Sequence, residues 1–114
     1  MNKKEAVELL RQNGIHIEGN ITFASRNKGK DVYWINSEFS FLQNEWKIIL
    51  NDPEEQKIRL VVVPAGAINR NIVRAKTSDA NKTHIEIDCS DFVDVKSENK
   101  SLCFRQWIRQ TIDY

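Results

Sequence analysis

Two apolar runs in the middle of the chain, separated by a turn-forming segment, constrain its fold more than any other feature. The runs are Trp46–Leu50 and Lys57–Val63, and residues 51–56 between them read Asn-Asp-Pro-Glu-Glu-Gln. β-Branched runs on either side of an Asp-Pro turn predict an antiparallel hairpin. The end of the second run, Leu60–Val63, is apolar on both faces, which is typical of a central strand that is covered on both sides. The core is therefore expected around this hairpin.

The length and composition predict one folded domain over residues 1–114. Hydrophobic residues make up 40% of the chain and charged residues 29%, as in globular proteins and unlike disordered ones. No apolar run approaches the roughly 20 residues that span a bilayer, so no membrane partner is expected. The N-terminus lacks the apolar stretch of a signal peptide, which predicts an intracellular, cytoplasmic protein.

The periodicity of apolar residues predicts a helix at each end of the chain. Asn2–Asn13 has a capping pair, Asn2 and Glu5, and an apolar stripe. Ser101–Ile112 carries apolar or small residues at three- and four-residue spacing. Strand patterns lie between these helices; short turns favour antiparallel pairing, including a second hairpin formed by residues 15–24 and 31–36. The expected fold is α+β: a mostly antiparallel sheet of about five or six strands, with both helices on one face.

One short motif resembles the metal-dependent nucleases of the PD-(D/E)XK class. Asp31 stands at the start of a predicted strand, and Glu45-Trp46-Lys47 opens the next one. The resemblance implies that Asp31 and Glu45 hold Mg²⁺ and that Lys47 stabilises charge. The chain departs from the class pattern because its apolar run follows Lys47, and because Lys30 stands where the class has proline. The alternative interpretation places Glu45 and Lys47 on the solvent side of a buried Trp46.

Basic residues beside aromatic residues form a second candidate site. Such a combination suits phosphate contact together with base stacking. The alternative is that these side chains are basic because loops are solvated, with Tyr33 and Trp34 divided between core and surface by strand alternation. The candidate nucleic-acid-binding residues are Arg26, Lys28, Lys30, Trp34, Arg70 and Arg74.

Residues 83–89 alternate between polar and apolar side chains. His84, Glu86 and Asp88 are expected on one face of a strand, where an exposed polar surface or a shared divalent ion would each explain them. Cys89 and Cys103 do not have the spacing of a zinc site, and both are predicted to be free, buried and unreactive thiols.

The function expected from these observations is a small, intracellular, non-catalytic interaction domain whose partner is another protein or nucleic acid. No cofactor and no metal site are expected. The alternative is a PD-(D/E)XK-like nuclease or an inactive relative, which alone would use Mg²⁺. A homodimer is a further expectation, because a small sheet has edge strands to protect.

Overall fold

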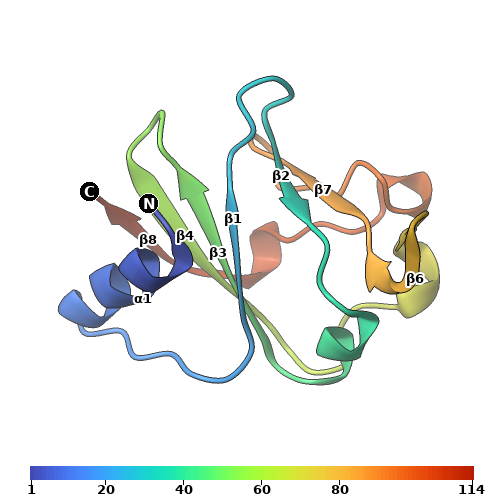
Figure 1. The fold of residues 1–114 in the computed structure, drawn as a ribbon, viewed down its shortest axis with the longest axis horizontal. Coiled ribbons are helices and arrows are strands. Elements are labelled where there is room, and N and C mark those ends of the chain that lie inside the picture. The colour runs from blue at the N-terminus through green and yellow to red at the C-terminus, as the bar shows by residue number, and fades with distance from the viewer.

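A computed structural model describes the whole chain, residues 1–114, and shows a mostly β protein with one α-helix and eight strands (Figure 1). The predicted α+β fold with a helix at each end is therefore wrong. Four short 3₁₀ turns, η1 to η4, connect the strands. The elements are α1 (Lys3–Gln12), β1 (Ile21–Ser25), β2 (Val32–Ile35), η1 (Phe39–Gln43), β3 (Trp46–Asp52), β4 (Lys57–Val63), η2 (Arg70–Ile72), β5 (Ala75–Lys76), β6 (Asp79–Thr83), β7 (Ile85–Asp88), η3 (Glu98–Lys100), η4 (Arg105–Trp107) and β8 (Ile108–Asp113).

The largest sheet has four strands in the order β1-β3-β4-β8. β3 and β4 form the predicted antiparallel hairpin, in register from Trp46 opposite Val63 to Asp52 opposite Lys57. β1 runs parallel to β3, so the expectation of one mostly antiparallel sheet fails here. Residues 26–45 connect these two strands, and this is long enough for the crossover of roughly a dozen or more residues that parallel pairing needs.

The remaining strands form two separate antiparallel pairs, β2 with β7 and β5 with β6. The second hairpin expected from residues 15–24 and 31–36 does not form, because β1 and β2 are joined only by an isolated bridge between Arg26 and Tyr33. β2 instead pairs with β7, which is distant in sequence, and Figure 1 shows these two strands beside the main sheet.

The main sheet separates two hydrophobic clusters. On one face, Ile48 and Val61 belong to a cluster of 17 buried residues. This cluster also contains Tyr33 and Ile35 of β2, and Ile85 and Ile87 of β7. On the other face, Ile49 and Leu60 belong to a cluster of six, to which α1 contributes two residues. Because neighbouring residues of a strand point to opposite faces, β3 and β4 must be apolar on both, as the sequence predicted for Leu60–Val63.

The N-terminal helix is confirmed. The Asn2 side chain accepts a hydrogen bond from the Glu5 backbone at 2.9 Å, and the Asn2 backbone donates to Glu5 Oε1 at 3.0 Å. Ala6 and Leu10 are buried against the sheet. No helix in the structure has the length and apolar character needed to cross a membrane.

The predicted C-terminal helix is wrong: a single 3₁₀ turn, η4, is followed by the edge strand β8. Phe104 is buried in the larger cluster and Ile112 in the smaller one, so the apolar residues of this segment serve opposite faces of the sheet. A helix would have directed them to one face. The register of the β4–β8 pairing shifts between Leu60 and Val61. This irregularity allows β8 to stay paired with β4 although the apolar side chains of the segment change from one face of the sheet to the other.

Candidate functional site

The three residues of the nuclease-like motif do not converge. The Asp31 carboxylate pairs with Arg26 at 3.1 Å, and Arg26 also pairs with Asp52, at the end of β3. Glu45 lies before the start of β3 and pairs with Lys47 at 3.2 Å. Glu45 precedes Asp52 by seven residues of mostly extended chain, which corresponds to about 20 Å. The structure also contains no group of three or more His, Cys, Asp or Glu side chains placed to hold a metal ion.

Arg26 is occupied by carboxylates. Its guanidinium meets Asp31, Asp52 and Glu54 at 3.1, 3.0 and 3.3 Å. Hydrogen bonds to Asp31 and Asp52 raise the pKa of Arg26, so it stays charged. Only 3% of the Asp52 side chain is exposed, and Arg26 therefore neutralises a buried negative charge. This arrangement gives Arg26 a role in the fold and leaves it little capacity to bind phosphate.

The other predicted basic residues are dispersed. Lys28 is exposed in the loop between β1 and β2. Arg70 lies over the Phe39 ring, with its guanidinium carbon 4.4 Å from the ring centre. Arg74 is exposed, and its backbone carbonyl accepts a hydrogen bond from the His84 N–H at 2.7 Å. Within the predicted set, Lys30 and Trp34 line one hollow, and Lys30 also borders a second hollow together with Arg26.

This hollow, called here the Trp34 groove, has a volume of about 290 Å³. Alternation along β2 creates it: Tyr33 and Ile35 point into the core, and Trp34 points outward with 49% of its surface exposed. Tyr33 and Trp34 are thus divided between core and surface, as the alternative interpretation of this segment expected. The groove is lined by Lys30, Trp34, Asn36, Lys76, His84, Ile85 and Glu86.

Glu86 forms the floor of the Trp34 groove. It lies directly opposite Trp34 in the β2–β7 register, and only 5% of it is exposed. Its Oε2 meets His84 Nε2 at 3.1 Å and Lys96 Nζ at 3.8 Å. Burial by itself would raise the pKa of Glu86, but the donors His84 and Trp34 and the charges of Lys96 and Lys30 lower it below its usual value. The floor of the groove is therefore an ionised carboxylate.

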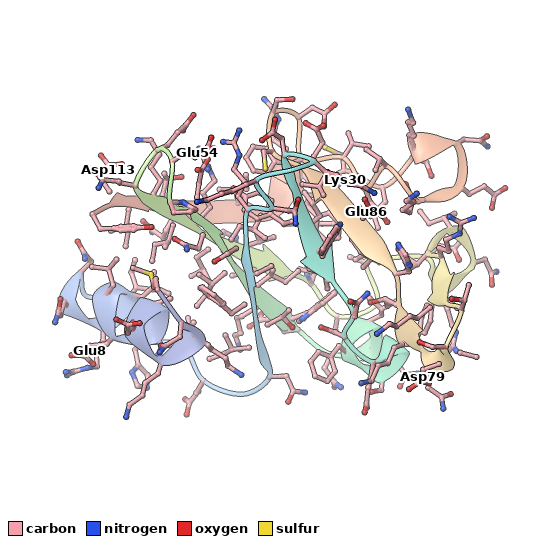
Figure 2. The ribbon with its side chains drawn as sticks, turned by 45° about the horizontal axis from the view of Figure 1, so that its top comes forward. Glu8, Lys30, Glu54, Asp79, Glu86 and Asp113 are labelled. Atoms are coloured by element: carbon pink, nitrogen blue, oxygen red, sulfur yellow. The ribbon has the colours of Figure 1, made fainter.

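The rim of the groove is positively charged. Lys30 comes from the β1–β2 loop and Lys76 from β5, and neither forms an ion pair within the protein. Figure 2 shows Lys30 and Glu86 close together along the β2–β7 pair. Sequence reasoning did not select Lys76, because nothing local indicates that β5 lies beside the end of β2.

His84, Glu86 and Asp88, which were expected to share one polar face of a strand, do not form one site. His84 and Glu86 are in contact, but Glu86 is buried where an exposed side chain was one of the expectations. Asp88 lies in a different hollow and accepts hydrogen bonds from Ser90.

Cys89 borders that second hollow, where burial raises the pKa of its thiol to about 11. This thiol is mostly protonated at neutral pH and therefore a poor nucleophile.

Comparisons with known proteins give no relative. No family model matches the chain, and neither a curated protein nor a solved structure shows significant similarity to it. The chemistry of the Trp34 groove therefore rests on its own residues. They present an exposed indole, two unpaired ammonium groups on the rim and a carboxylate on the floor.

Proposed function

We propose that this chain is a non-catalytic interaction domain that binds single-stranded nucleic acid through the Trp34 groove. The observation that carries the proposal is the half-exposed indole of Trp34 in a groove that it shares with two lysines, Lys30 and Lys76, which form no ion pair in the protein. Aromatic side chains stack on bases of any sequence, and lysines beside them bind the phosphates.

The size of the groove favours an unpaired base over a duplex. Its volume of about 290 Å³ lies at the lower end of the range for small-molecule sites. Bases within a duplex are covered by their stacked neighbours, and recognition of individual bases targets unstacked ones. The two rim lysines favour an anionic ligand over a cationic peptide.

The net charge of the chain is +1, so attraction to nucleic acid must be local. We expect moderate affinity with a clear dependence on salt. For single strands, each phosphate contact contributes about 0.7 to the slope of log K against log salt concentration. Replacing both Lys30 and Lys76 with glutamine should reduce this slope by about 1.4. Replacing Lys3 and Lys4, on the exposed surface of α1, provides the matched control.

The decisive experiment measures binding of labelled single-stranded DNA and RNA by fluorescence anisotropy. Trp34→Ala should weaken binding about 5- to 150-fold, which corresponds to the ~1–3 kcal/mol of one stacked base. Tyr114→Ala removes another exposed aromatic residue, outside the groove, and should leave the affinity nearly unchanged. If the wild-type protein binds no oligonucleotide at low salt, or if both variants lose the same affinity, the proposal is wrong.

A further inference from the structure

We infer that Glu86 makes the Trp34 groove selective for guanine. This inference rests on the proposed function and concerns which base the same groove accepts. It starts from the position of Glu86, which is the cross-strand neighbour of Trp34 and the buried floor of the groove. A base stacked on the indole would therefore direct one of its edges toward this carboxylate.

The carboxylate has unused capacity to accept hydrogen bonds. His84 and Lys96 both approach Oε2, and the Trp34 indole lies close enough to lower the pKa of the carboxyl group. No hydrogen bond of standard geometry within the protein reaches Oε1. An ionised carboxylate has two oxygens and only accepts. Because Glu86 is almost fully buried, a ligand that covers the groove must supply donors to Oε1 or leave it desolvated, which costs about 1–3 kcal/mol or more.

The four bases differ in what they can offer to such an acceptor. Guanine presents two adjacent donors, N1–H and the N2 amino group, which match the two oxygens of a carboxylate. Adenine and cytosine each offer one amino group beside a ring nitrogen that is itself an acceptor. Thymine and uracil offer one N–H between two carbonyl oxygens. The carboxylate can therefore accept two bonds from guanine and at most one from each of the other bases.

The positive side chains around Glu86 do not cancel this preference. Lys96 lies 3.8 Å from Oε2, and Lys30 and Lys76 lie on the rim, where phosphates would pass. The groove thus offers ammonium groups at its entrance, which would bind the phosphates of the nucleic acid, and a carboxylate on its floor, which would bind the edge of the base.

The test uses thymidine oligonucleotides that carry one central guanine, adenine or cytosine, with the all-thymidine strand as reference. A single guanine avoids four-stranded assembly. We expect the guanine strand to bind about 5- to 150-fold more tightly than the all-thymidine strand, the range supplied by a good bidentate base contact. Replacing this guanine with inosine, which lacks the N2 amino group, should remove most of the gain. Replacing it with 7-deazaguanine, which keeps both donors, should not.

Glu86→Gln keeps the shape of the side chain but converts one acceptor into a donor. It should abolish the guanine preference, so that this variant binds the guanine strand and the all-thymidine strand with similar affinity. Glu18→Gln, an exposed acid outside the groove, is the matched control. The base and inosine series on the wild-type protein need no variant, so they decide the question even if Glu86→Gln folds poorly.

The outcomes separate this inference from the proposed function. Equal binding of all four strands, or undiminished binding of the inosine strand, overturns the guanine selectivity and leaves nucleic-acid binding in place. Absence of binding to every strand overturns both. A guanine preference that inosine and Glu86→Gln both remove supports the inference.

Discussion

Asp94 shows how a single residue can couple the fold to pH. The side chain is fully buried, and its Oδ1 accepts hydrogen bonds from the backbone N–H groups of Glu86 and Lys96, both at 3.0 Å. Its Oδ2 has no partner. Burial raises the pKa of Asp94 above its ordinary value of 3.8, because a charge on an unpartnered buried oxygen is unfavourable.

Because the pKa of Asp94 is raised in the native state, protonation of this residue favours folding. As the pH rises from 3.8 toward the raised native pKa, the native state keeps the proton on Asp94 longer than the unfolded state does. Stability attributable to this residue is therefore present at low pH and is lost as the pH rises through the native pKa. Asp94→Asn keeps the Oδ1 acceptor and removes the titration.

We predict that the free energy of unfolding of Asp94→Asn, relative to wild type, improves as the pH rises above 3.8. Urea unfolding measured from pH 3 to pH 7 tests this prediction, with the exposed Asp91→Asn as control. A difference between Asp94→Asn and wild type that stays constant with pH would contradict it.

Strand alternation correctly predicted that neighbouring residues of β2 lie on opposite sides of the strand. It could not predict which distant residues contact them. It separated Tyr33 from Trp34, because adjacent strand residues always face opposite ways. It failed at Glu86, whose polar side chain suggested solvent exposure, because burial there depends on Trp34 and Lys96, which belong to other parts of the chain.

At the level of elements, the C-terminal segment is the clearest case of competing patterns. Its apolar spacing suits a helix, but three of its last residues, Ile108, Thr111 and Ile112, are β-branched and favour a strand. The backbone N–H of Tyr114 donates to the Gln56 carbonyl at 2.8 Å, which fixes the direction in which β8 faces β4. By alternation, the N–H of Gln110 also faces β4, and the N–H of Thr111 faces away from it.

This alternation predicts different effects of proline at two adjacent exposed positions. Gln110→Pro should destabilise the protein by about 1–3 kcal/mol, because a backbone acceptor on β4 loses its donor. Thr111→Pro should cost less, since an edge strand tolerates proline where the N–H faces solvent. Chemical unfolding of the two variants provides the comparison. Equal and severe losses would instead indicate a helix, in which proline costs about 3 kcal/mol at any interior position.

The whole molecule is organised by one sheet with a hydrophobic cluster on each face. β3 and β4 contribute to both clusters, so neither cluster can be lost without exposing the sheet that supports the other. The Cα radius of gyration, 13.4 Å, is close to the ~13 Å of a compact domain of about 100 residues. These features predict a single cooperative unfolding transition.

Truncations in opposite clusters test this cooperativity. Leu10→Ala, in α1, and Ile85→Ala, in β7, should each lower the free energy of unfolding by about 2–5 kcal/mol. Tryptophan fluorescence, which includes Trp46 from the larger cluster, and far-ultraviolet circular dichroism should report the same midpoint for each variant. If Leu10→Ala shifts the circular dichroism transition and leaves the fluorescence transition in place, the two faces unfold independently.

The sequence by itself determined the features that depend on neighbouring residues: the capped helix α1, the β3–β4 hairpin, and the burial of β4 on both faces. Capping, turn formation and alternation act over a few positions, so their signals are present in local sequence. Tertiary structure alone decided that β1 lies parallel to β3, that β2 pairs with β7, and that the last segment is a strand. These outcomes depend on which apolar surfaces, far apart along the chain, meet in the folded core. The same is true of the Trp34 groove, which needs residues from β2, β5 and β7 and therefore exists only after those strands have come together.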